Sequence, residues 1–201
     1  MKKLFLFFLT FIPILIYSQQ DDVVVNTDSI PKVGIHVSYF GGVWIPNGNL
    51  SILGNHPLVG VQFGIRTDKL LIDLTLQFKF LKSQNHFQVN HNNTSFDTDH
   101  FFGGYYGLDL GYNLINRKSN LIDLLSGVGL DGFDVLKIND KVKKTINTLN
   151  LNIGIGYRRI IGSYTYIGLD IKYNFIDYDN SDGTNLSGDA MSSLLKFGLG
   201  F

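Results

Sequence analysis

The chain has 201 residues, and 17 basic residues balance 17 acidic ones, so the formal net charge is zero. A nucleic-acid-binding protein normally carries a basic face, so this balance argues against a nucleic-acid partner. The absence of cysteine excludes a disulfide framework. The sequence has no phosphate-cradling motif and no nucleophile elbow, and we predict neither a cofactor nor a catalytic residue.

The N-terminus has the pattern of a targeting segment. Lys2 and Lys3 precede an apolar run over residues 4–16, which predicts a secretory signal peptide over residues 1–18. The alternative is a retained helical anchor, but the run is shorter than the roughly 20 residues that a spanning helix needs. Residues 19–32 are polar and are predicted to form a disordered periplasmic leader.

From Val33 onward, apolar residues recur at every second position. In the clearest stretch, aliphatic and aromatic residues at the even positions 70–80 alternate with mostly polar residues at odd positions. An amphipathic helix would space its apolar residues differently, so the pattern predicts strands. Eight such strands are predicted, near residues 33–44, 58–67, 70–81, 101–114, 121–133, 149–157, 167–175 and 193–201.

The predicted connections alternate in length. Short turns are expected at 67–69, 116–119 and 162–163, and long polar loops near 45–57, 82–100, 134–148 and 179–192. This alternation is typical of outer-membrane barrels, in which turns face the periplasm and loops face outward.

The two faces of the strands differ in polarity. In the last strand Leu195, Phe197 and Leu199 point one way, whereas Lys196 and Gly198 point the other. The other strands repeat this contrast, whereas a soluble carrier barrel would have the opposite polarity. The predicted fold is therefore all-β: an eight-stranded antiparallel up-and-down transmembrane β-barrel over residues 33–201.

The predicted interior carries charges of both signs, which must be paired because buried single charges are costly. We expect a network of ion pairs that fills the lumen, with Asp123 near Arg158 and Asp131 near Asn150. Its members are predicted to be Asp73, Asp109, Asp123, Asp131 and Asp170 with Arg66, Lys79, Arg158, Lys172 and Lys196.

Aromatic residues are predicted to form two girdles at the membrane surfaces, where rings are favoured because one edge is apolar and the other polar. Trp44 is predicted to anchor the first loop at the membrane surface. The loop-side girdle comprises Phe78, Phe80, Phe102, Tyr106, Tyr173 and Phe175, and the turn-side girdle Tyr112, Tyr157 and Phe201.

The signal peptide, the eight alternating strands, the rhythm of turns and loops and the terminal Phe201 resemble small outer-membrane barrels of the OmpA/OmpX type, and the composition resembles barrel-only proteins of Bacteroidota. The resemblance covers residues 33–201. It implies a monomer in the cell outer membrane, surrounded by lipid and lipopolysaccharide, with Phe201 read by the barrel-assembly machinery.

Two sets of residues are weighed as sites. His36 and Ser38 share a strand face, as a lipid hydrolase would need, but that face points into the lumen and no third group is evident. His86, His91 and His100 lie in one loop with Asp97 and Asp99, but without the spacing of a metal site. We therefore predict neither catalysis nor metal binding.

The function predicted from the sequence is structural, or a surface interaction through four long extracellular loops of a barrel with a plugged lumen. The alternatives are a small channel or a secretion or assembly accessory, and, third, a membrane-embedded lipid hydrolase. No ligand of the loops is indicated.

Overall fold

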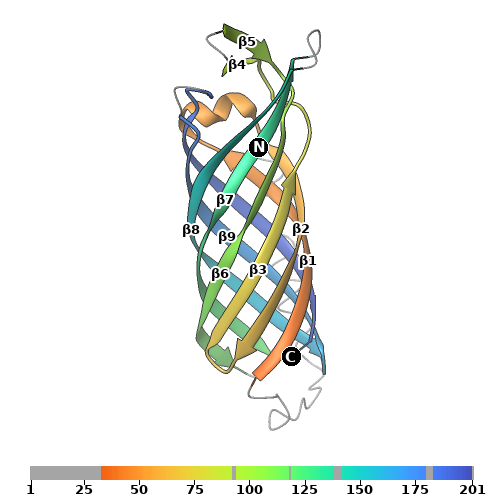
Figure 1. The fold of residues 1–201 in the computed structure, drawn as a ribbon. Helices are drawn as coiled ribbons and strands as arrows, with labels where there is room; N and C mark the ends of the chain where they lie inside the picture. Colours follow the sequence, from red (N-terminus) through yellow and green to blue (C-terminus); the bar gives the residue numbers. More distant parts are fainter. Residues whose placement is uncertain (1–32, 92–93, 118, 138–141, 180–182, 201) are drawn as a thin grey trace, which may run out of the picture.

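The computed structural model describes residues 33–91, 94–117, 119–137, 142–179 and 183–200. Eight antiparallel strands close into a barrel in the order β1-β10-β9-β8-β7-β6-β3-β2 (Figure 1). The predicted signal peptide, the leader and Phe201 lie outside the described residues. The barrel strands are β1 (Val33–Pro46), β2 (His56–Thr67), β3 (Leu70–Lys79), β6 (Phe102–Arg117), β7 (Asn120–Lys137), β8 (Val142–Gly162), β9 (Thr165–Asp177) and β10 (Ser187–Leu199).

The predicted eight-stranded barrel is confirmed. Most of its strands are longer than predicted, whereas β3 ends at Lys79 rather than at residue 81. The expected loop over 134–148 is largely strand, because β7 continues to Lys137 and β8 begins at Val142. The expected loop over 179–192 is shorter, because β10 begins at Ser187. These extra residues are mostly polar, and ladder hydrogen bonds to the neighbouring strands hold them in extended conformation. Their few inward apolar residues, Val135, Ile146 and Ala190, are buried.

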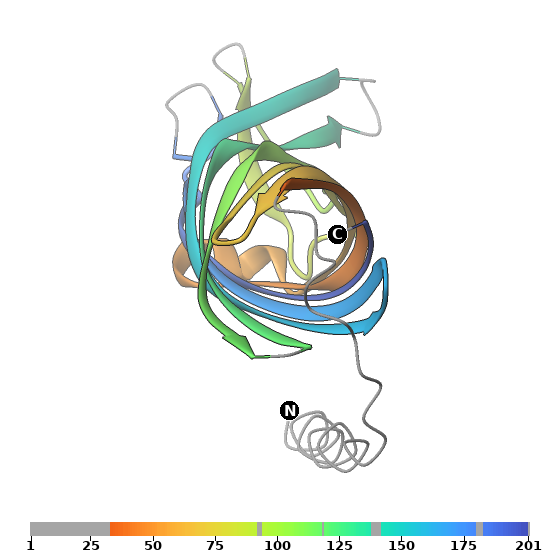
Figure 2. The same ribbon diagram turned by 90° about the horizontal axis from the view of Figure 1, so that it is seen from below.

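The two ends of the barrel differ. At the turn end, the strand pairs β2–β3, β6–β7 and β8–β9 are joined by short turns. The opposite, loop end carries the 3-10 helix η3 (Gly48–Leu53) and a hairpin of β4 (Phe87–His91) and β5 (Thr94–Thr98), which forms a separate two-stranded sheet (Figure 1). Neither η3 nor this hairpin was predicted. Seen along its axis, the barrel is a closed ring of strands (Figure 2).

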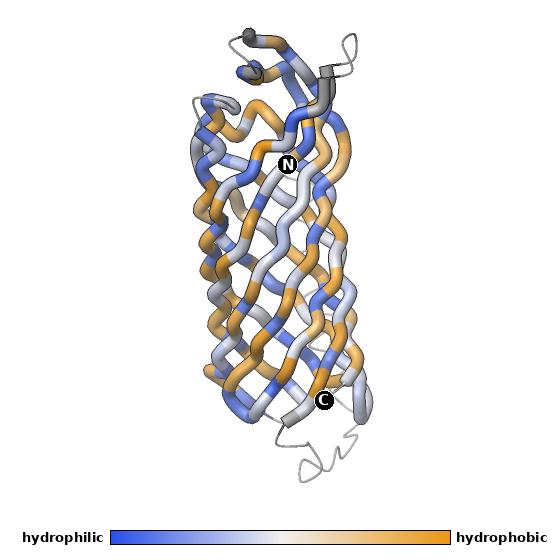
Figure 3. The backbone as a smooth tube through the Cα atoms, viewed as in Figure 1, coloured by the Kyte–Doolittle hydropathy of each residue, from blue (hydrophilic) through white to orange (hydrophobic). Residues whose placement is uncertain are grey.

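The outer face of the barrel is apolar. On β3, β8 and β9 the outward apolar positions run over 70–78, 149–157 and 167–175, nine residues each. A tilted transmembrane strand needs about 9–11 residues, so each run matches the hydrocarbon core. Hydrophobic and hydrophilic segments alternate along the strands between the two ends (Figure 3). Among the described residues, no helix is long and apolar enough to cross a membrane.

Candidate functional site

The lumen is polar, and its centre is organised by Asp109 on β6. Lys172 on β9 lies with its Nζ 2.6 Å from Asp109 Oδ2, and Thr75 on β3 donates a hydrogen bond of 2.6 Å to the same oxygen. Gln62 on β2 and Asn152 on β8 add further donors at 3.2 and 3.3 Å. Side chains from four other strands thus converge on one buried carboxylate. Their donors satisfy the hydrogen-bonding capacity of its oxygens, and together these side chains occupy the centre of the lumen.

The turn-end half of the lumen holds three further pairs of an acidic and a basic side chain. His36 Nε2 lies 2.8 Å from Asp73 Oδ1, and Lys196 pairs with Asp170. Arg158 pairs with Asp123, and its Nε lies 2.8 Å from Oδ2 of that carboxylate.

The pair Asp123–Arg158 confirms the predicted contact. It also shows why the partners meet: β7 and β8 are antiparallel neighbours, and Arg158 lies opposite Leu121, two residues from Asp123.

The loop-end half of the lumen is organised by Asp131. Lys79 Nζ lies 2.5 Å from Asp131 Oδ1, and Asn150 donates to Oδ2 at 3.1 Å, as predicted. Tyr178, from the β9–β10 connection, donates its hydroxyl to the same carboxylate. Burial raises the pKa of Tyr178 well above its ordinary value, and the Asp131 charge adds to this, so the phenol keeps the proton that it donates.

All five predicted lumenal aspartates therefore have a basic partner, and His36 is the partner of Asp73. Each of these ten side chains is buried. Arg66, the remaining predicted member, is also buried in the lumen.

Glycines make room for these charges. A Cβ on Gly64 would lie 1.9 Å from Asp73 Oδ1, and one on Gly127 would lie 2.1 Å from Asp109 Oδ1. These are neighbours across the ladder, since Gly64 pairs with Asp73 and Gly127 with Asp109. Each carboxylate thus lies over the bare backbone of the neighbouring strand. The interior of an eight-stranded barrel is just wide enough for side chains to fill it, so these glycines provide the space for the ion pairs.

Above the charges, the loop end of the lumen is filled by an apolar cluster, here called the cork. Its aromatic centre is Trp44, Phe101, Phe133 and Tyr178, with ring centroids 6.2 Å apart for Trp44–Phe101, 5.1 Å for Phe101–Phe133 and 4.9 Å for Phe133–Tyr178. The cork comprises Phe40, Trp44, Leu50, Leu53, Leu58, Phe87, Val89, Phe96, Phe101, Phe133, Val135, Ile146, Ile176, Tyr178, Leu186, Ala190 and Leu194.

The prediction that Trp44 anchors a loop at the membrane surface is wrong. Trp44 is only 1% exposed, and Lys79 Nζ lies 4.6 Å from its ring centroid. Trp44 is on β1, which continues to Pro46, and its place in the alternation directs it inward, as it does Phe40. Trp44 therefore joins the cork to the ion pair beneath it.

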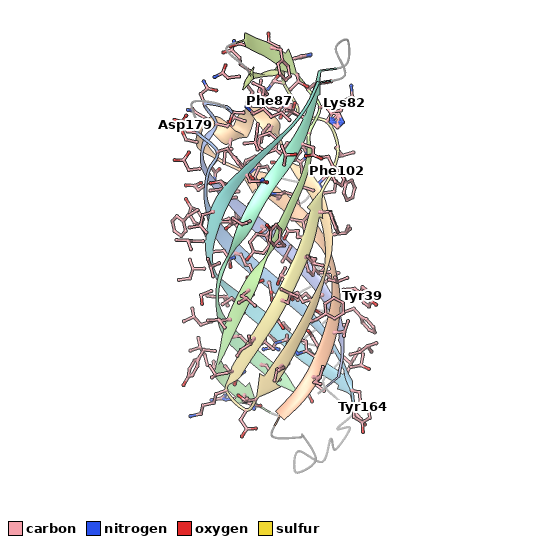
Figure 4. All side chains as sticks on the ribbon, in the orientation of Figure 1. Tyr39, Lys82, Phe87, Phe102, Tyr164 and Asp179 are labelled. Carbon is pink, nitrogen blue, oxygen red and sulfur yellow. The ribbon has the colours of Figure 1, made fainter. Side chains whose placement is uncertain are left out.

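The β4–β5 hairpin closes over the cork. Phe87, Val89 and Phe96 are buried in it, while hydrophobic and polar side chains alternate along both strands. The hairpin is pinned by the backbone bond from Asn90 N to Gly183 O at 2.7 Å and by Lys144, which donates to Asn90 O at 2.7 Å. Figure 4 shows Phe87 at the base of the hairpin, above the barrel wall.

The weighed hydrolase pair does not form a triad. His36 and Ser38 both point into the lumen and are 2% and 0% exposed. His36 faces Asp73, but the Ser38 hydroxyl donates to Gln62 Oε1 at 3.3 Å. Nucleophilic catalysis needs the base bonded to the nucleophile and access for substrate, and this geometry provides neither.

The weighed metal residues are dispersed in the connection that carries the hairpin. His86 is exposed, His100 is half-buried, and the side chain of His91 lies outside the described part. Asp99 accepts a 2.9 Å hydrogen bond from Lys82, which lowers the pKa of Asp99. Within the described ranges, no group of three or more His, Cys, Asp or Glu side chains could hold a metal ion.

Most of the predicted girdle residues lie on the outer face as expected, whereas Phe80 lies beyond the end of β3 and is half-buried. Phe78, Phe102 and Tyr106 are 48%, 46% and 56% exposed near the loop end. Tyr112 is exposed nearer the turn end, and the partly buried Tyr157 donates its hydroxyl to Asn120.

The sequence matches no family model and no curated protein. Its fold is similar to Neisserial surface protein A (12% identity, TM-score 0.57, covering 84% of this chain and 96% of that one). It is also similar to the N-terminal β-barrel domain of Pseudomonas aeruginosa OprF (15%, 0.52, 84% and 97%) and to a major outer membrane protein from Thermus thermophilus (12%, 0.52, 84% and 99%). At these low sequence identities the similarity shows a shared fold only.

The closed eight-stranded barrel, its apolar outer band and its polar lumen define the class of the protein. This architecture is that of the small outer-membrane barrels. The chain has the fold of an outer-membrane β-barrel protein.

Proposed function

We propose that this barrel is closed by its own side chains and acts as a structural or surface-interaction protein rather than as a channel or an enzyme. The observation that carries this proposal is the double closure of the lumen. Buried ion pairs lie in the lumen at three levels, and the cork fills the loop end above them. An ion that entered would have to separate several buried pairs, each costly to break.

The exposed part of the protein supports a role at the cell surface. The loop end carries η3, the β4–β5 hairpin and the extended β7–β8 hairpin beyond the apolar band. With the turns in the periplasm, these segments face outward, as in barrels of this class. Outer-membrane lipid and lipopolysaccharide are the proposed surroundings, the barrel-assembly machinery the proposed partner during insertion, and the monomer the proposed state.

The conductance of the full chain in a planar lipid bilayer tests the closed lumen. We expect no stable conducting steps at neutral pH in moderate salt. The matched variant Lys172→Ala with Asp109→Ala removes the central pair, and we expect it to stay non-conducting because the cork remains. Stable, ion-selective steps in the unmodified protein would overturn the proposal in favour of a small channel.

A further inference from the structure

Three segments of the loop end meet at the imidazole of His56. This residue is the first of β2 and is 0% exposed. Its Nε2 lies 3.0 Å from the carbonyl oxygen of Leu53, the last residue of η3, and its Nδ1 lies 3.2 Å from the carbonyl oxygen of Phe80. Phe80 directly follows β3 and begins the connection that carries the β4–β5 hairpin. One buried side chain thus joins η3 and this connection to the barrel wall.

Backbone hydrogen bonds attach the same connection to η3. The N–H of Gln84 donates to Leu53 O at 2.8 Å, and the N–H of Asn85 donates to Ile52 O at 3.2 Å. Together with the imidazole, these bonds hold residues 80–85, here called the strap, against η3.

The strap contains backbone strain next to the carbonyl that His56 contacts. Leu81 has a φ of 94°, in the left-handed region that disfavours a residue with a side chain. Its side chain is 60% exposed, so its own packing does not impose this conformation. Such strain persists only where surrounding contacts enforce it. The contacts on the two sides of Leu81 are those of Phe80 with His56 and of Gln84 with η3, so the strap would relax if they were released.

The charge state of His56 changes what it can bind. A neutral imidazole has one N–H and donates to one of the two carbonyl oxygens, whereas the imidazolium donates to both. The rings of Trp44 and Phe101 cover the imidazole, with centroids 5.8 and 4.3 Å from its own. A proton on His56 therefore adds one hydrogen bond but places a cation inside the apolar cork, where no water hydrates it.

Other charges near His56 come from two elements and the connection. Lys79 on β3 acts on the imidazole electrostatically, and its Nζ lies 2.5 Å from Asp131 on β7. The helix η3 has no charged residue. The titratable side chains of the connection from β3 to β6 are those of Lys82, His86, His91, Asp97, Asp99 and His100.

The balance of these effects disfavours the proton. Burial lowers the pKa of His56 from its ordinary value of 6.5, and the Lys79 charge lowers it further, although the contacts with Phe80 and Leu53 act in the opposite direction. His56 lies on the loop side of the outward apolar run of β2, which begins at Val59, so water reaches the imidazole once the strap lifts.

The sign of the pH dependence follows by linkage. The closed form binds a proton on His56 more weakly than an open form in which the imidazole is hydrated. The closed form therefore has its full stability above about pH 6.5 and loses it as the pH falls toward the lowered pKa of His56.

We propose that His56 is an acid-released latch, whose protonation frees the strap from η3 and opens the cork to water. The proposal goes beyond the closed lumen, because the ion pairs below the cork stay in place in both forms. The latch can therefore fail while the closed lumen stands.

The test is acrylamide quenching of the full chain in phospholipid vesicles, measured from neutral to mildly acidic pH. Trp44 is the single tryptophan, is 1% exposed and lies against His56, so it reports directly on the cork. We expect quenching to increase reversibly below about pH 6.5, while far-ultraviolet circular dichroism shows an intact barrel. For each pH unit by which the pKa of His56 is lowered, full protonation should raise the ratio of open to closed form about tenfold.

Matched variants assign the response to one side chain. His56→Gln does not titrate in this range and still donates a hydrogen bond, so the acid-induced increase in quenching should be lost. His86→Gln is the control: His86 lies on the same connection but is exposed, and the response should remain.

The unmodified chain provides a second readout that needs no variant. In a nuclear magnetic resonance titration, the imidazole signal of His56 should change with the same midpoint as the quenching of Trp44, and this midpoint should lie below about 6.5. The proposal is overturned if acid leaves Trp44 inaccessible or if His56→Gln keeps the response. It is also overturned if His56 titrates above its ordinary value, since acid would then tighten the strap.

Discussion

At the scale of single residues, the lumen follows one rule: each buried aspartate has its own basic partner. Asp109 shows this most fully, with Lys172 and Thr75 as its closest donors and Gly127 vacating the space that its carboxylate occupies. Burying such charges has a desolvation cost. The attraction between the two partners offsets this cost only while both of them are present.

Removing one partner of this pair should cost more than removing both. We expect Lys172→Met to lower the free energy of unfolding by about 3–5 kcal/mol, because Asp109 is left charged and buried. The double variant Lys172→Met with Asp109→Asn should recover part of this loss. Urea titrations in phospholipid vesicles, followed by far-ultraviolet circular dichroism, measure both; equal losses in the two variants would contradict the ion pair.

At the scale of elements, the β4–β5 hairpin shows how a polar loop acquires structure from its place in the fold. Its apolar residues Phe87, Val89 and Phe96 alternate with polar ones over only five residues in each strand. An isolated two-stranded hairpin is marginally stable in water. Here the cork below and the bond to Gly183 above the barrel mouth hold it in place.

Loss of the hairpin should open the cork without unfolding the barrel. Replacing Phe87–Thr98 by a short Gly-Ser turn should leave the barrel strands intact, because the hairpin forms a separate sheet. Trp44 is the single tryptophan of the chain, so its fluorescence reports on the cork alone. We expect a red-shifted emission that acrylamide quenches more readily, whereas Gln88→Ala, at an exposed hairpin position, should change neither.

At the scale of the whole molecule, apolar side chains face lipid and charged side chains face the barrel axis. The centre of the outward run on β6 is Leu110, which is 50% exposed and lies opposite Ile72 on β3. Neighbouring residues of the barrel cover only half of the Leu110 side chain, and the exposed half faces the bilayer.

A charge at this point should therefore destabilise the protein in a bilayer. Leu110→Arg should lower the free energy of unfolding by about 2–4 kcal/mol in phospholipid vesicles, the cost of an arginine at the bilayer midplane. Leu110→Met is the control and should change it by less than about 1.5 kcal/mol, as volume-conserving swaps do. If arginine is tolerated as well as methionine, position 110 does not face hydrocarbon.

The sequence alone determined the strand count, the two faces and the members of the ion network except His36, because the period of two fixes which residues share a face and a barrel has only one inside. It also determined the pairs Asp123–Arg158 and Asp131–Asn150, which follow from the register of one hairpin. Only the tertiary structure decided the other pairs. The register of β1, β2 and β3 places His36 beside Asp73, and the closed barrel brings Lys172 on β9 to Asp109 on β6 across the lumen. The same holds for the cork, in which Trp44 is buried rather than at the membrane surface. Alternation shows that a residue points inward or outward, but only the closed barrel, with its stagger and its folded-over hairpin, decides what it meets there.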